Sequence, residues 1–351
     1  MSPRVCALCL PAILVVSPLS DEQLAFAPEE GTSLTKSFSL GVELEIGETS
    51  FLFDGDAFEG FDVSGTRSFE RVVTVTDRYA AVEDGRPTVL QRTYDRLAVI
   101  TGGVFDDLEA DGTEEGSELE GISVVFTWDA EDEEYGVAFG EDDDGEDEDL
   151  LDGLWEDLDL RALLPGTEVA EGDTWEIDAA DLLGILVAGG DLKIGADEEL
   201  PDFGDMEEGQ IMIVMPNVPD DPMMWLEDLE GEIAAEYQGL RDTGEFDVAV
   251  VALELEIQSA AELSEWLSER MPGRPDMDAA DLTISFEGEG ELLWNLEEGH
   301  FHSLEIEGEV AVEYYVAWGL PAGPATIELE MTQELEGSIA ITARLGEEDD
   351  E

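Results

Sequence analysis

Apolar and polar residues alternate along most of the chain. The segment LGVELEI, residues 40–46, places its apolar side chains on one side of an extended strand and polar ones on the other. After residue 280 the alternation is more regular, with apolar positions at Leu282, Ile284, Phe286, Leu292 and Trp294; at Leu304, Ile306, Val310, Val312, Tyr314 and Val316; and at Ile327, Leu329, Met331, Leu335, Ile339 and Ile341. One apolar face and one acidic face are typical of an antiparallel sheet that water wets on one side. The length of these stretches predicts long strands in a large, twisted and curved sheet.

Helical spacing is confined to short stretches. DLLDGLWEDLDLRALL has its apolar residues at helical spacing, at Leu151, Leu154, Trp155 and Leu158. Asp178 is predicted to cap a short helix that runs through Val187, and Ser259 with Glu262 forms a capping box before LSEWLSERM. In EFDVAVVALELEI the apolar parity shifts between residues 250 and 251, which predicts a bulge.

The pattern divides the chain into five parts. They are a signal peptide (1–27), an N-terminal β section (28–140), an acidic and helical insertion (141–204), a C-terminal antiparallel β section (205–346) and an acidic tail (347–351). The predicted fold class is therefore mainly β (α+β), with one or more large curved antiparallel sheets of long strands and a short helical insertion.

The first segment has the features of a secretory signal. Arg4 precedes an apolar run at residues 5–16, which suits a signal peptide and is too short to span a bilayer. AFA, residues 25–27, offers small residues at the two positions that define a cleavage site. A buried N-terminal strand and a misplaced start codon are the alternatives. Because Cys6 and Cys9 both lie in this segment, the mature chain would have no disulfide, and its predicted location is periplasmic or extracellular.

Charge narrows the set of partners. The chain has 91 Asp and Glu against 14 Lys and Arg, for a net charge of −77, and Lys36 and Lys193 are its only lysines. Nucleic acid and anionic membrane surfaces are excluded as partners because both require a basic footprint. The Debye length falls from about 10 Å at 0.1 M salt to about 3 Å at 1 M, so brine screens the repulsion between these charges. Counter-cations are therefore the expected partners of the surface, whether the acidity serves a saline habitat or specific cation binding.

One loop-like stretch resembles a calcium site. In DLEADGTEEGSE, the first, third, fifth and twelfth positions of an EF-hand loop are filled by Asp107, Glu109, Asp111 and Glu118. Gly112 stands at the sixth position, but Glu114 occupies the eighth position, which is normally aliphatic, and the flanks do not read as helices. A looser Ca²⁺ site is the remaining alternative, and no other cofactor is predicted.

The two histidines offer a second candidate site. His300 and His302 stand two apart, so on a strand both rings would point the same way and reach one metal ion. We favour a hairpin instead, with NLEEG as its turn, because no cysteine of the mature chain and no further histidine can complete the ligand set. The chain has no GxSxG elbow, so no catalytic residue is predicted. Carboxylates alone can hydrolyse glycosides, yet nothing in the sequence singles out a pair.

Residues 206–225, MEEGQIMIVMPNVPDDPMMW, are rich in methionine and proline. Thioether side chains pack adaptably, so this segment is predicted to form a flap over an apolar ligand on the curved sheet. Its candidate residues are Met212, Met215, Met223, Met224 and Trp225. The alternative is that these residues fill an irregular part of the core.

LLPGTEVAEGDTWEID, residues 163–178, reads as a double corner that inserts Trp175 and Ile177 into the core. Together with AVEDGRPTVLQRTYD (81–95) and GEGELLWNLEEGHFHSLEIEGE (288–309), it resembles a family of uncharacterised secreted proteins of planctomycete-like bacteria. The resemblance rests on a leucine-proline, valine, glycine-aspartate-x-tryptophan signature. It implies an exported β-rich protein with no established activity and no catalytic residues.

These observations predict an exported, highly acidic, non-enzymatic protein of the cell envelope or the extracellular space. Two other classes stay open. One is a carrier of a lipid or other apolar ligand on the curved sheet, and the other is a carboxylate-dependent polysaccharide hydrolase.

Overall fold

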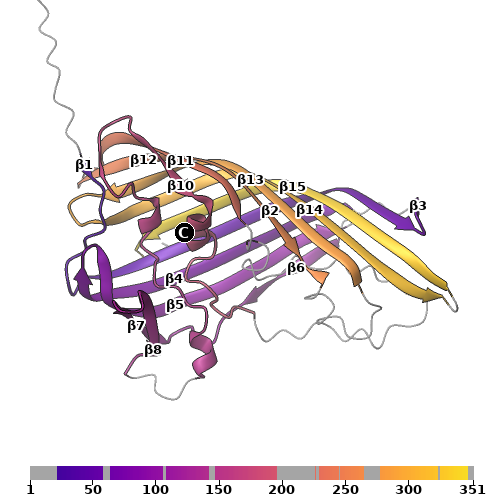
Figure 1. Cartoon of the computed structure of the whole chain (residues 1–351), viewed down its shortest axis with the longest axis horizontal. Helices are drawn as coiled ribbons and strands as arrows, with labels where there is room; N and C mark the ends of the chain where they lie inside the picture. The colour runs from indigo at the N-terminus through magenta and orange to yellow at the C-terminus, as the bar shows by residue number, and fades with distance from the viewer. Residues whose placement is uncertain are drawn as a thin grey trace, which may run out of the picture.

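The computed structural model describes residues 22–57, 64–105, 108–141, 147–195, 226, 229–244, 246–264, 277–322 and 325–346. A 13-stranded antiparallel sheet dominates it, in the order β10-β11-β12-β13-β14-β15-β2-β4-β5-β7-β8, with β3 beside β2 and β6 beside β5 (Figure 1). The strands of the sheet are β2 (Ser33–Phe53), β3 (Asp56–Ala57), β4 (Gly65–Glu83), β5 (Arg86–Phe105), β6 (Leu108–Glu115), β7 (Ser123–Asp129), β8 (Glu134–Phe139), β10 (Thr174–Asp178), β11 (Glu230–Asp242), β12 (Asp247–Glu262), β13 (Met277–Asn295), β14 (His300–Ala322) and β15 (Ala325–Leu345). A two-stranded sheet pairs β1 (Glu22–Gln23) with β9 (Glu168–Val169). The predicted fold class is confirmed.

The two predicted β sections form one sheet. β15 pairs with β2 along nearly their whole length, from Leu345 opposite Lys36 to Leu329 opposite Phe53. Strands from the beginning and the end of the described chain are thus neighbours in the middle of the sheet.

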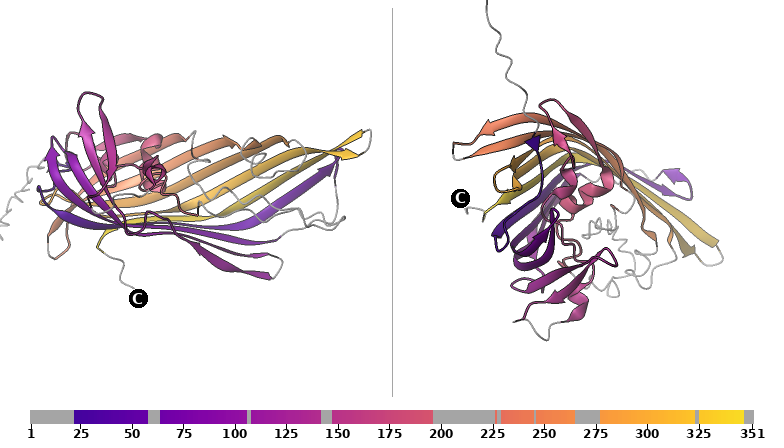
Figure 2. Two further views of the ribbon diagram at one scale, coloured as in Figure 1. Left: turned by 90° about the horizontal axis from the view of Figure 1, so that it is seen from below. Right: turned by 60° about the vertical axis from the view of Figure 1, so that its left-hand side comes forward.

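The alternation has the predicted structural meaning. On β13, Leu282, Ile284 and Phe286 are buried, while Thr283 and Ser285 between them are exposed. We call the apolar side of the sheet the inner face and the acidic side the outer face. The sheet curves around its inner face (Figure 2).

Glycines allow neighbouring strands to approach closely where the sheet curves. Gly288 of β13 lies opposite Gly308 of β14. A Cβ atom on Gly288 would lie 2.8 Å from the carbonyl oxygen of Glu307 and 2.8 Å from the ring of Phe286. A larger residue would force the two strands apart, so glycine is required at this pair.

Residues 147–195, which we call the insertion, lie against the inner face near one end of the sheet. In both figures this magenta segment is on the side of β1 and far from β3 and the β14–β15 turn. Leu158, Leu163 and Leu182 of the insertion are at most 1% exposed. The insertion and the inner face therefore share one hydrophobic core.

The prediction of a helix around residues 151–158 is wrong. Two short 3-10 helices, η1 (Glu148–Leu151) and η2 (Arg161–Leu163), flank irregular backbone in which Leu154 and Leu158 are buried. The apolar spacing here reflects packing of an irregular segment onto the sheet and not one face of a helix.

The short helix at residue 178 is confirmed. The Asp178 carboxylate accepts a hydrogen bond from the backbone N–H of Ala180, and η3 (Ala179–Leu182) continues into α1 (Leu183–Leu186). Among the residues that the structure describes, no helix is long and apolar enough to cross a membrane.

Of two local predictions in β12, the capping box is wrong and the bulge is confirmed in position, with its extra residue on the partner strand. Ser259 and Glu262 both lie within the strand, so they form no capping box, and residues 265–276 lie outside the described ranges. The register shift expected between residues 250 and 251 occurs in the neighbouring strand, where Tyr237 and Gly239 of β11 pair with those two residues. Residues 248–251 of β12 are buried on both faces, and this burial explains the apparent change of parity.

The segment at residues 22–27 belongs to the fold. Leu24 and Phe26 are 2% and 4% exposed, and the Phe26 ring packs edge-on against Tyr79. The backbone N–H of Ala27 donates to the carbonyl of Gly299 at 2.8 Å. A cut after Ala27 would remove β1 and two core side chains, whereas residues 1–21 lie outside the described ranges.

Candidate functional site

Three charged side chains occupy inner-face positions where the alternation predicts apolar ones. Lys36 of β2, Asp77 of β4 and Arg92 of β5 are each 0% exposed. Their strands are adjacent in the sheet. Charged residues are almost never fully buried unless they are paired, so this row requires partners.

The partners come from the sheet and from the insertion. The Lys36 ammonium lies 2.8 Å from the Asp77 carboxylate and 2.6 Å from that of Asp159 in the insertion. Arg92 binds Asp77 in a bidentate manner, through Nε at 2.7 Å and a terminal nitrogen at 2.8 Å. The Tyr79 hydroxyl donates to Asp159. We call Lys36, Asp77, Tyr79, Arg92 and Asp159 the ionic cluster.

Further cationic side chains bind the backbone of the insertion. Arg92 donates to the carbonyl oxygens of Trp155 and Glu156, at 2.8 Å each. Arg71 of β4 donates to the carbonyl oxygen of Gly190 at 3.0 Å. In a chain with few basic residues, several of them thus fasten the insertion to the sheet.

Burial and neighbouring charges shift the pKa values of Asp77 and Tyr79 in the ionic cluster. Burial alone would raise the pKa of Asp77, but the Arg92 guanidinium and the Lys36 ammonium outweigh it and lower that pKa. Burial raises the pKa of Tyr79 well above its ordinary value, and the nearby Asp159 carboxylate adds to the effect. The hydroxyl therefore stays a hydrogen-bond donor to Asp159.

Glu156 is the carboxyl beside this cluster that titrates near neutrality. It is 6% exposed, and one carboxylate oxygen lies 2.5 Å from the Arg161 guanidinium, while the other, Oε1, has no partner among the described residues. Burial raises the pKa of Glu156 to about 7; Arg161 opposes the shift, and Asp157 and Asp159 reinforce it. The cluster is closed to solvent, so its chemistry is that of an anchor and not that of a site for a substrate.

Farther along the inner face, a polar row crosses three strands. Tyr314 of β14 is in register with Gln333 of β15, which is in register with Thr49 of β2. The Gln333 side-chain amide donates to the Thr49 hydroxyl at 3.4 Å. We call these three residues the polar row. Thirteen residues along β2 separate Lys36 from Thr49, so the row lies about 40 Å from the ionic cluster.

Apolar rows flank the polar row on both sides. One is made of Val312, Leu335 and Ile46, and the other of Val316, Met331 and Phe51. On β14, β15 and β2 the inner face is therefore apolar on both sides of this narrow polar band.

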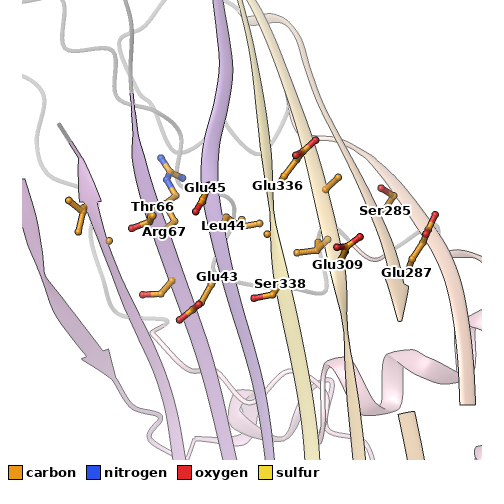
Figure 3. Close-up of a pocket in the computed structure, with 16 residues that line it drawn as sticks. Glu43, Leu44, Glu45, Thr66, Arg67, Ser285, Glu287, Glu309, Glu336 and Ser338 are labelled. Carbon is orange, nitrogen blue, oxygen red and sulfur yellow. The ribbon is translucent and has the colours of Figure 1, made fainter. Parts of the chain in front are cut away.

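The outer face carries an acidic pocket of about 900 Å³ (Figure 3). Strands β2, β4, β5, β13, β14 and β15 contribute to its lining, which includes Glu43, Glu45, Glu287, Glu309 and Glu336. Within the described part of the chain, no group of three or more His, Cys, Asp or Glu side chains is arranged to hold a metal ion. The pocket is thus a concentration of outer-face carboxylates that attracts cations in general.

The predicted cation loop is largely a strand. Glu109 and Asp111 lie in β6, whose residues pair with β5, and Glu118 follows in the turn before β7. Asp107 lies outside the described residues. A ladder of this kind differs from the compact loop that wraps around calcium in an EF-hand.

The candidate flap residues, from Met212 to Trp225, all lie outside the described ranges, so the flap stays a prediction. The hairpin at the histidines is confirmed, since β13 ends at Asn295 and β14 begins at His300. His300 Nε2 lies 3.1 Å from the Glu298 carboxylate, whereas His302 packs edge-on against Phe246. The two rings thus have different partners.

The stretch at residues 163–178 forms the predicted corner. Gly172 donates its N–H to the carbonyl of Tyr237, and the Asp173 carboxylate accepts from the N–H of Ala170. Trp175 is half-buried and donates its indole N–H to the carbonyl of Leu163 at 3.1 Å. These groups hold β10 against β11 and carry no chemistry.

Comparisons with known proteins give little more. No protein-family model and no curated protein matches the chain. Among solved structures, an outer membrane channel from Pseudomonas putida F1 is 8% identical, with 93% of this chain and 100% of that chain covered and a TM-score of 0.20. The outer membrane protein OprG from Pseudomonas aeruginosa is 7% identical, with 89% and 97% covered and a TM-score of 0.17. Similarity at this level is weak and carries no argument about function.

Proposed function

We propose that the protein is an exported, non-enzymatic protein of the cell envelope or extracellular space that binds an apolar ligand on the inner face of its curved sheet. The observation that carries this proposal is the inner face itself. Its apolar rows continue across β13, β14, β15 and β2 for about 40 Å beyond the region fastened to the insertion. The opposite face is acidic, so the inner face is the side of the sheet whose chemistry suits an apolar ligand.

The electrostatics favour binding over catalysis. Hydrolysis of a polysaccharide by carboxylates needs a general acid with a raised pKa in an open cleft. Glu156, whose pKa is raised to about 7 by burial, does not line the acidic pocket. Asp181, whose pKa is raised by partial burial and by the nearby Asp178 carboxylate, does not line that pocket either.

Export is supported by the signal-like N-terminal sequence and by the resemblance to secreted β-rich proteins. The family that the chain resembles has no established activity, so the resemblance indicates none for this protein. The carboxylates of the outer face fit a protein that meets counter-cations outside the cytoplasm and is kept away from anionic lipid surfaces.

The test is to purify the protein from its native host in molar NaCl, extract it with organic solvent and analyse the extract by mass spectrometry. We expect an apolar compound in near-stoichiometric amount. The extracted protein should then bind the fluorescent probe N-phenyl-1-naphthylamine. An empty extract, together with no probe binding, refutes the proposal.

A matched pair of variants locates the ligand. Val312 lies on the inner face, whereas its neighbour Ala311 is exposed on the outer face. Val312→Glu should abolish probe binding, while Ala311→Glu should leave it unchanged. Since a buried glutamate can prevent folding, Val312→Ala provides a milder variant, which should weaken binding while circular dichroism stays native. Equal binding by the Val312 and Ala311 variants contradicts an inner-face site.

A further inference from the structure

Tyr314 of β14 has a buried hydroxyl group that no described residue hydrogen-bonds. The side chain is 5% exposed, and among the described residues its hydroxyl oxygen has no hydrogen-bond partner. Burial raises the pKa of this phenol above its ordinary value, so it remains a neutral O–H donor. Buried polar groups are almost always hydrogen-bonded, so an unpartnered donor points to a group that the described residues do not supply.

The hydroxyl does not stand alone. Tyr314 is the first residue of the polar row, and the Gln333 side chain beside it is 3% exposed. The ladder between β15 and β2 changes register at this place, because two residues of β2 stand opposite one residue of β15 between the pairs Gln333–Thr49 and Leu335–Ile46. A bulge re-aims the side chains of its strand and is common next to binding sites. Here it turns Thr49 to the inner face, in line with Gln333.

We propose that the polar row binds the head of an uncharged amphiphile, whose carbonyl oxygen accepts a hydrogen bond from the Tyr314 hydroxyl while its apolar chain lies along the flanking rows. An ester or amide of a long-chain acid has this chemistry. The row contains a phenol, an amide and a hydroxyl but no charge, so a neutral head suits it best. The net charge of −77 disfavours an anionic amphiphile. The inference rests on the proposed function and adds the class of ligand.

Tyr315 provides a matched control. It is the next residue on β14, faces the outer side of the sheet, and donates its hydroxyl to the Glu330 carboxylate at 3.3 Å. Each of Tyr314→Phe and Tyr315→Phe removes a single oxygen atom, from opposite faces of the same strand.

The experiment uses solvent-extracted full-length protein in molar NaCl, loaded with N-phenyl-1-naphthylamine. Methyl laurate and tridecane, two chains of similar length with and without a carbonyl, are added as competitors. We expect methyl laurate to displace the probe from wild-type protein and from Tyr315→Phe at a concentration about five- to tenfold below that of tridecane, the effect of one buried hydrogen bond. Tyr314→Phe should lose this preference and should bind tridecane as wild type does.

Two results overturn the inference. If Tyr314→Phe keeps the preference for methyl laurate, the hydroxyl does not bind the head. If Tyr314→Phe in the absence of ligand unfolds at a lower temperature than Tyr315→Phe, the hydroxyl is engaged within the chain. Failure of wild-type protein to bind the probe or either competitor is a different result, which refutes the proposed function itself.

Discussion

Glu156 gives the most direct test of the electrostatic reasoning. Glu156→Gln replaces a buried carboxyl with a neutral group of the same size, which can still accept a hydrogen bond from Arg161. The carboxyl has an ordinary pKa of 4.5 and a pKa of about 7 in the fold, because burial disfavours its charged form. One pKa unit corresponds to about 1.4 kcal/mol, so ionising Glu156 costs the folded state about 3 kcal/mol relative to the unfolded chain.

The sign of the pH dependence follows from this raised pKa. Below about pH 4.5, Glu156 is protonated in both the folded and the unfolded chain, and no stability is lost. As the pH rises from 4.5 through 7, the unfolded chain ionises first, so the wild-type protein progressively loses stability. Glu156→Gln does not lose this stability, because the amide of glutamine does not ionise. Its free energy of unfolding relative to wild type should therefore increase by about 3 kcal/mol between pH 4.5 and pH 8.

The assay is urea unfolding followed by tryptophan fluorescence in 2 M NaCl at several pH values, where salt screens the surface carboxylates. Glu168→Gln, an exposed position in β9 of the same insertion, serves as the control and should show no such trend. A difference between Glu156→Gln and wild type that stays constant from pH 4.5 to pH 8 refutes the reasoning.

Three further predictions concern the anchor, the N-terminal segment and the surface. Lys36→Met leaves Asp77 and Asp159 buried without their shared cation and should cost about 3–5 kcal/mol of unfolding free energy in urea titrations. Lys193 belongs to a partly exposed ion pair, so Lys193→Met should cost about 1 kcal/mol or less. Similar losses for both variants would contradict the role of the ionic cluster as an anchor. Phe26→Ala should cost about 3–5 kcal/mol of unfolding free energy. N-terminal sequencing of the protein from its native host should find a first residue at or before position 22; a chain that begins at residue 28 and is equally stable would be the opposite result. NaCl and CaCl₂ at matched ionic strength should raise the melting temperature equally, since the described residues offer no cluster of three metal ligands, and a saturable gain at millimolar calcium would show a specific site.

The sheet could be predicted from the sequence because a period of two is a local property. Long strands such as β13 and β14 need no knowledge of their partners to be recognised. The pairing of β2 with β15 has no such local signal, because it depends on how distant segments meet. The predicted helix around residues 151–158 failed for a related reason, since Leu154 and Leu158 are spaced by the surface on which they pack.

The ionic cluster has a signal in the sequence that belongs to no motif. Lys36 shares the parity of Leu34 and Phe38, and Asp77 shares that of Val75 and Tyr79. A charge at a core position of an alternating strand, in a chain with so few bases, predicts a buried partner. The identity of that partner, Asp159, was not predictable, because it lies in an irregular segment with no period of its own.

The neighbouring positions of β2 and β15 affect how the molecule is made. During synthesis β2 emerges early, and the strand that pairs with one of its edges, β15, emerges last among those described. Until then a 21-residue strand with an apolar face presents unpaired backbone groups to other chains. Contacts between such distant segments form slowly, and the intermediate in which β2 lacks β15 is prone to aggregate. The carboxylates are charged before the chain folds, so at low ionic strength their repulsion keeps incomplete copies apart as well as folded ones.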